Sequence, residues 1–113
     1  MRWIVILAAI SFAAPATAAP VYLRCKIDGA NSDFTITLDE ERGTAVTLGR
    51  PVPATFAMDE VSFEENVAGV VRIRDRINRK TLDMTTVAQV KGKEEGEPRH
   101  GRCEVVKATE NKF

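Results

Sequence analysis

Residues 71–78 have the sequence VRIRDRIN, and this stretch decides the fold of the chain. Val71, Ile73 and Ile77 fall on one side of an extended backbone and three arginines fall on the other. Alternation with a period of two is typical of a β-strand that has one buried face and one face in water. The stretch ends our longest predicted strand, residues 67–78, and no part of the chain beyond its first residues shows a helical period.

The same alternation extends along the chain in both directions. Further strands are predicted at residues 21–27, 34–38, 44–48, 52–58, 61–63, 82–90 and 101–105. Seven or eight short strands at this regular spacing predict an all-β domain, an antiparallel meander that forms a small barrel or a sandwich. We expect Val46, Leu48 and Met58 to face the core. Pro53 predicts an edge strand or a bulge, because proline lacks the N–H that a central strand donates.

The first residues predict a leader for export. Residues 4–10 are an unbroken apolar run, and residues 16–18 have the small-x-small pattern that signal peptidase accepts. We therefore expect a signal peptide over residues 1–18 and a single disulfide-tied β domain over residues 19–113. The apolar run is shorter than the roughly 20 residues that cross a bilayer, so we favour cleavage over an N-terminal anchor. The predicted location is periplasmic or secreted, with no stable membrane anchor after cleavage.

Cys25 and Cys103 are the two cysteines of the chain. Export would place them in an oxidising compartment, where two cysteines allow one intramolecular bridge. Such a bridge would join the first strand to the last, favour a closed sheet and stabilise the domain by about 4 to 5 kcal/mol. A redox pair or a metal site is the alternative. We favour the bridge, because there is no C-x-x-C motif and His100 has no further ligands near it, and we expect no metal or cofactor.

The arginines of the deciding stretch form the candidate binding face. Arg72, Arg74 and Arg76 would project from one face of a single strand about 7 Å apart, and Arg79 and Lys80 extend the row. Such a row could bind an anionic ligand or the acidic surface of an envelope protein. The alternative, which we favour, is a solvated face whose charge is offset by acids on neighbouring strands.

Asp75 interrupts the pattern of this strand. The alternation directs its carboxylate toward the core, where a charge needs a partner or several hydrogen-bond donors. We favour a bulge, or a strand end that leaves the core for solvent. A polar position near the barrel mouth is the alternative.

Charge and motifs exclude several classes of function. The chain has 16 Lys+Arg and 16 Asp+Glu, and this balance argues against a nucleic-acid-binding protein. It contains no motif of a serine hydrolase, a zinc protease or a phosphate-binding loop, so we do not expect an enzyme. We predict a non-enzymatic binding or interaction module of the bacterial envelope. The alternative is a small-ligand carrier that uses the barrel interior.

Three short runs resemble a pattern of small uncharacterised exported bacterial proteins. They are FTITLDEE at residues 34–41, RINRKTL at residues 76–82 and GRC at residues 101–103, and the resemblance implies a small β domain. The chain is also similar to the periplasmic inhibitors of c-type lysozyme, which are small exported barrels with a tyrosine near an early cysteine, as Tyr22 is near Cys25. That similarity implies an inhibitor of an envelope-directed hydrolase. The S-G-x-x-Y loop of those inhibitors is missing, so no inhibitory residue can be assigned.

Overall fold

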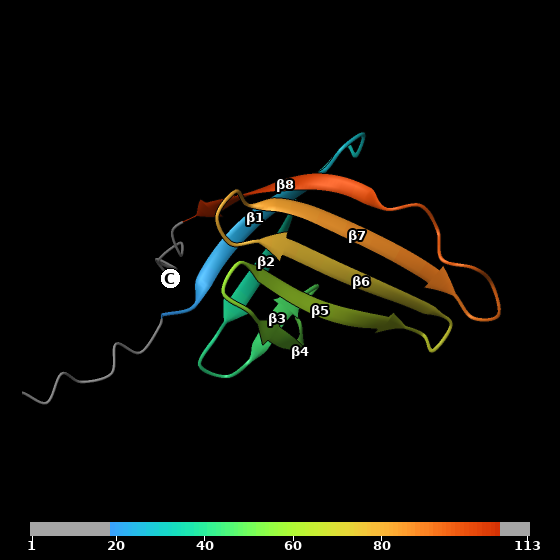
Figure 1. The fold of residues 1–113 in the computed structure, drawn as a ribbon, viewed down its shortest axis with the longest axis horizontal. Helices are drawn as coiled ribbons and strands as arrows, with labels where there is room; N and C mark the ends of the chain where they lie inside the picture. The colour runs from blue at the N-terminus through green and yellow to red at the C-terminus, as the bar shows by residue number, and fades with distance from the viewer. Residues whose placement is uncertain (1–18, 107–113) are drawn as a thin grey trace, which may run out of the picture.

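The computed structural model describes residues 19–106; the expected leader at residues 1–18 lies outside the described residues, as do residues 107–113. Within this part of the chain there is no helix long and apolar enough to cross a membrane. Eight strands follow one another, and each pairs antiparallel with the next. They are β1 (Val21–Ile27), β2 (Phe34–Asp39), β3 (Thr44–Thr47), β4 (Arg50–Phe56), β5 (Glu60–Val67), β6 (Val71–Asn78), β7 (Asp83–Val90) and β8 (Arg99–Val106). β8 pairs back with β1, so the predicted meander is confirmed and closes as a barrel (Figure 1).

The disulfide lies in the ladder that closes the barrel. Cys25 of β1 and Cys103 of β8 are directly opposite each other, both are buried, and they form the predicted bridge. Gly101 of β8 allows the same two strands to approach. A Cβ atom at this position would lie 2.6 Å from the carbonyl oxygen of Lys26 and 2.9 Å from Cδ1 of Ile27. The disulfide therefore holds the first strand against the last, and Gly101 leaves room for their close approach.

Apolar side chains fill the middle of the barrel around this bridge. The buried ones are Leu23, Ile27, Ile36, Leu38, Ala45, Val61, Phe63, Ile77 and Met84. Two expectations about inward residues were wrong. Ala45 and Thr47 face the interior in place of Val46 and Leu48, because β3 pairs Ala45 with Leu38 and Thr47 with Ile36. Met58 is 88% exposed, because β4 ends at Phe56 and Met58 lies in the turn that follows.

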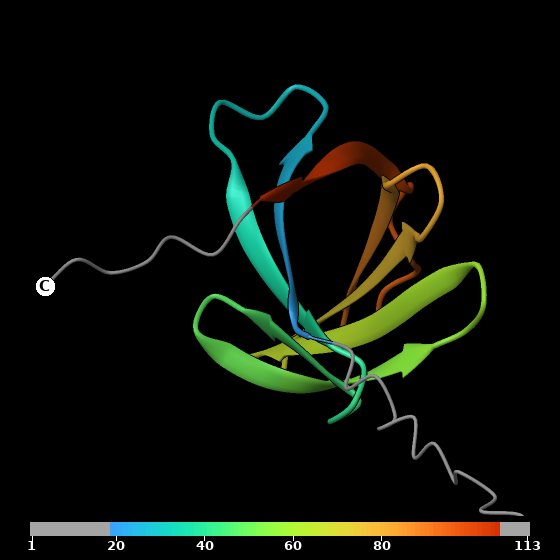
Figure 2. The ribbon, with the colours of Figure 1, turned by 90° about the vertical axis from the view of Figure 1, so that its left-hand side faces the viewer.

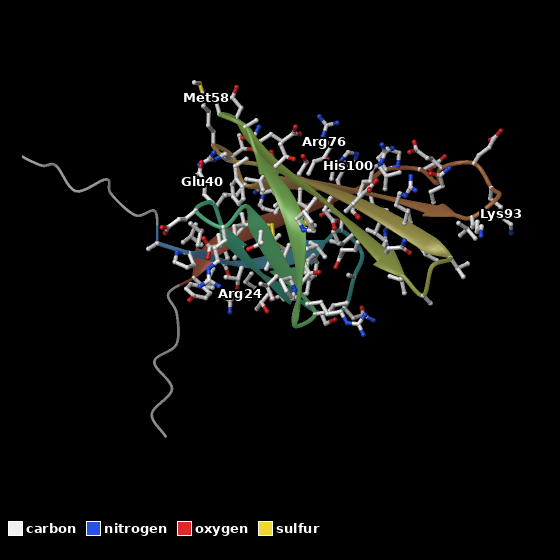
Figure 3. The ribbon with its side chains drawn as sticks, turned by 90° about the horizontal axis from the view of Figure 1, so that it is seen from below. Arg24, Glu40, Met58, Arg76, Lys93 and His100 are labelled. Carbon is white, nitrogen blue, oxygen red and sulfur yellow. A yellow bond between two sulfur atoms is a disulfide. The ribbon has the colours of Figure 1, made fainter. Side chains whose placement is uncertain are left out.

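The two ends of the barrel differ. The start of β1 and the β6–β7 turn lie at one end, which we call the mouth, and from this side the strands surround a common axis (Figure 2). At the other end, which we call the far end, β5, β6 and β7 extend beyond β3 and β4 (Figure 1). Figure 3 shows Glu40 and Met58 toward the mouth and Lys93 at the far end.

Replacement of both cysteines by alanine tests the closing bridge. The bridge spans 78 residues of sequence, and a loop of this length is expected to contribute about 4 to 5 kcal/mol by restricting the unfolded chain. We expect the free energy of unfolding in urea to fall by about that amount for the variant. Reductant should lower the stability of the wild type to the same level and leave the variant unchanged. A wild type that keeps its stability in reductant would contradict the role of the bridge.

Candidate functional site

The five cations predicted as a binding face do not form one surface. Arg72, Arg74 and Arg76 are exposed along the outer face of β6, as the alternation predicted. Arg79 and Lys80 lie in the β6–β7 turn at the mouth, beyond the end of β6. The structure therefore separates a row on the outer face from a pair at the mouth.

Carboxylates face the three arginines of the outer row. The Nε of Arg76 donates to Glu60 of β5 at 2.7 Å, and this hydrogen bond raises the pKa of Arg76 above its ordinary value. The Nε of Arg72 lies 3.8 Å from Glu64, also on β5. The third, Arg74, contacts Glu95 in the β7–β8 loop. Exposed pairs of this kind add little stability, but they offset the charge of the row. The three arginines are thus exposed and opposed by acids, as in the solvated face that we favoured. Anion binding by this row stays a prediction.

The mouth contains a cavity of about 280 Å³. Its lining is mostly apolar, and it comes from six strands, the β2–β3 and β6–β7 turns and the chain just before β1. The lining residues are Ala19, Val21, Leu23, Leu38, Glu40, Phe56, Val61, Ile77, Arg79, Leu82 and Val105. Buried core residues form part of this lining, so the cavity opens directly above the packed middle of the barrel.

Two charged residues, Arg79 and Glu40, close part of the rim. Nη2 of Arg79 donates to Glu40 at 2.9 Å, and Nη1 donates to the carbonyl oxygen of Ala57 at 2.7 Å. The guanidinium also lies over the ring of Phe56, 5.9 Å from its centroid, within the range of a cation–π contact. The contacts of Arg79 therefore join the β6–β7 turn to β4 and to the turn after β2.

The β6–β7 turn is itself held in a fixed shape. The side-chain oxygen of Asn78 accepts hydrogen bonds from the backbone N–H of Lys80 at 2.8 Å and of Thr81 at 2.9 Å. Leu82 has a φ of 64°, a left-handed conformation that leucine rarely adopts. The backbone N–H of Leu82 donates to the backbone carbonyl of Asn78 at 2.8 Å. The carbonyl of Leu82 accepts from the backbone N–H of Cys103 at 2.9 Å. These bonds hold the Leu82 side chain in the cavity wall.

Two of the runs that carry the sequence resemblance meet at this cavity. Leu38 and Glu40 belong to the run at residues 34–41, while Ile77 and Arg79 belong to the run at residues 76–82. The sequence singled out Arg79 only as part of a basic row. Its pairing with Glu40, 39 residues away, was missed because it depends on how the turns of separate hairpins meet.

Asp75 lies inside the barrel, and the expectation of a bulge or an exit to solvent was wrong. It is 4% exposed, and its strand is regular there, with Phe63 opposite on β5 and Thr86 opposite on β7. Glu65, the next inward residue of β5 toward the far end, faces the same space and accepts a hydrogen bond from the hydroxyl of Thr47. The carboxylate is therefore buried as the alternation indicated, within a small polar group.

This environment raises the pKa of Asp75 to about 7. Burial is the largest cause, because a charged carboxylate loses its hydration inside the barrel. A hydrogen bond from Thr86 opposes the shift, whereas hydrogen bonding and repulsion from Glu65 add to it. Near neutral pH, Asp75 is therefore protonated in a large fraction of the folded molecules.

Compared with protein-family models, with curated proteins and with solved structures, the chain matches none of them. The class of protein that the structure defines is a small eight-stranded antiparallel β-barrel. Within residues 19–106 no group of three or more His, Cys, Asp or Glu side chains could hold a metal ion. What the mouth offers chemically is apolar contact inside a charged and hydrogen-bonded rim.

Replacement of Asp75 by asparagine tests the buried acid. The folded pKa of about 7 lies above the ordinary value of 3.8, so wild-type stability is full below pH 4 and falls as the pH rises to about 7. Between pH 4 and pH 8, the free energy of unfolding of the wild type should fall by about 4 kcal/mol relative to that of Asp75→Asn. Urea unfolding across this pH range measures the difference. The exposed Asp83→Asn is the matched control and should follow the wild type. Parallel profiles for the wild type and Asp75→Asn would refute the assignment.

Proposed function

We propose that this protein is an exported, non-enzymatic interaction module, and that its mouth cavity binds an apolar side chain of a partner protein. The observation that carries the proposal is the cavity itself, an apolar recess whose rim is fixed by Arg79, Glu40 and the Asn78 turn. Rigid pockets that accept one anchoring side chain dominate the energetics of many protein interfaces. A fixed rim also reduces the entropy lost on binding.

The size of the cavity favours a side chain over a whole ligand. About 280 Å³ lies at the lower limit of the range of roughly 300–1,000 Å³ for small-molecule pockets. The space beneath it is occupied by Leu23, Val61 and Ile77, each almost completely buried. A partner would therefore insert one residue and rest on the rim, which carries the exposed side chains Val21 and Val105.

Capture of partners from bacterial envelope extract tests the proposal with two matched variants. Leu82→Asn suits the left-handed backbone while it places an amide in the cavity wall. Val70→Asn makes the same kind of change on the half-exposed β5–β6 turn at the far end. We expect the wild type and the Val70→Asn variant to capture the same partner protein. The Leu82→Asn variant should capture at least tenfold less of it. Equal capture by all three proteins would argue against the mouth as the binding site.

The specific form of the proposal is a protein inhibitor of an envelope-directed hydrolase. It is supported by the barrel fold and by the likeness to inhibitors of c-type lysozyme. Purified protein at micromolar concentration should slow the lysis of cell walls by c-type lysozyme, and Leu82→Asn should be at least tenfold weaker. Unchanged kinetics with the wild type would remove lysozyme as the target and leave the capture experiment to identify another.

The alternative is a small-ligand carrier, and the apolar lining of the cavity is the observation in its favour. A carrier should retain its ligand through gentle purification. Native mass spectrometry would then show an added mass that denaturation releases and that Leu82→Asn lacks. A spectrum of the bare chain would count against the carrier.

A further inference from the structure

A second hollow lies at the far end of the barrel, opposite the mouth, and its volume is about 550 Å³. This volume is well within the range of small-molecule pockets. Its lining comes from β3, β4 and β5 and from the turns that follow β3 and β5. The lining residues are Thr47, Leu48, Arg50, Val52, Glu65, Asn66, Val67 and Ala68. The ladder between β4 and β5 ends at Ala54 and Phe63, and the hollow lies beyond that last pair.

One wall of this far-end hollow carries a carboxylate that is held in place. Glu65 accepts a hydrogen bond from the hydroxyl of Thr47, and both residues line the hollow. Asp75 is buried and lies outside the lining; it shares a hydrogen bond with Glu65 and accepts another from Thr86. Glu65 therefore presents to the hollow a carboxylate whose position is fixed from two sides.

The same hollow carries a guanidinium group. Arg50 and Thr47 are directly opposite each other in the ladder of β3 and β4, so their side chains lie on the same, inward side of the sheet. Cβ atoms at such positions are about 5 Å apart, so Arg50 starts beside the residue that holds Glu65. Within residues 19–106 Arg50 forms no ion pair. A positive and a negative group therefore lie in one hollow without contacting each other.

Apolar side chains line the space around these two charges. Val52 is opposite the buried Ala45, and Val67 follows Glu65 on the inward side of β5. Leu48, at the tip of the β3–β4 hairpin, is 87% exposed and has a φ of 50°, where asparagine or glycine is the ordinary choice. A leucine so exposed to water contributes little to the stability of the barrel, whereas a ligand in the hollow would give it an apolar contact.

We propose that the far-end hollow binds a small zwitterion with an apolar side chain, that is, an apolar α-amino acid. Its ammonium group would pair with Glu65 and its carboxylate with Arg50, as charge-assisted hydrogen bonds. Its side chain would pack on Leu48, Val52 and Val67.

The pair of opposite charges selects this class of ligand over others. A purely apolar molecule would cover Glu65 and Arg50 and leave both without a partner, which is costly. A simple anion or a simple cation would pair with only one of them. An α-amino acid carries both charges on a single carbon atom, and its side chain leaves from the same atom toward the apolar wall.

The far-end hollow and the mouth cavity are separate sites. No residue lines both of them, and the packed core lies between. The proposal for the far end therefore does not depend on the function proposed for the mouth, and either proposal can fail alone.

L-Leucine tests the proposal, together with two analogues that each lack one charge. Titration of the ¹⁵N-labelled protein followed by NMR should give a submillimolar dissociation constant for leucine. The amide signals of Thr47, Arg50 and Glu65 should shift, and that of Leu82 at the mouth should not. Isopentylamine lacks the carboxylate and 4-methylpentanoate lacks the ammonium group, so each should bind at least tenfold more weakly.

Two substitutions remove the charges of the hollow one at a time. Arg50→Gln should weaken leucine binding at least tenfold and should not weaken the binding of isopentylamine, which has no carboxylate. Glu65→Gln should weaken the binding of both at least tenfold. Arg50 is exposed, so its variant keeps the test valid even where Glu65→Gln disturbs the barrel. The matched controls Arg72→Gln and Glu64→Gln, on the outer faces of β6 and β5, should bind leucine as the wild type does.

Several results would overturn the proposal. They are the absence of shifts at millimolar leucine, equal affinity for leucine and either analogue, and leucine binding that Arg50→Gln and Glu65→Gln both retain. Shifts confined to the residues of the mouth would equally refute a site at the far end.

Discussion

The ladder between β1 and β8 is the constraint on which the rest of the structure depends. A meander of eight strands can stay open, but here Cys25 and Cys103 join its two ends and Gly101 lets them approach. Closure gives every inward position a common interior, and the apolar residues of the strands fill it. It also brings the start of β1 and the end of β8 together at the mouth, where Val21 and Val105 contribute to one cavity.

Unequal strand lengths decide where the barrel departs from regularity. β3 has 4 residues, whereas β5, β6 and β7 have 8 each. The long strands must extend past their short neighbours, and their exposed edges then need partners. The β7–β8 loop covers the edge of β7, and on the other side the ladder between β4 and β5 ends at Ala54 and Phe63. The projecting far end thus results from the unequal lengths of the hairpins.

Alternation in the sequence was enough to predict the class, the order of the strands and most inward positions. It failed in β3, where Ala45 and Val46 are both apolar and only the pairing with β2 decides which faces inward. For Asp75 the alternation indicated burial correctly. The residues that make burial tolerable, Thr86 and Glu65, lie on neighbouring strands and become visible only once the register is known. The ion pair between Arg79 and Glu40 was not predicted for the same reason, because the two residues lie on turns of separate hairpins.

The acid inside the barrel also changes what folding exchanges with the solution. Because the pKa of Asp75 is about 7 in the folded state and lower in the unfolded chain, folding at mildly acidic pH takes up a proton. The heat of unfolding measured by calorimetry therefore includes the ionisation heat of the buffer that accepts that proton. The folding equilibrium therefore registers the acidity of the surrounding solution through one side chain.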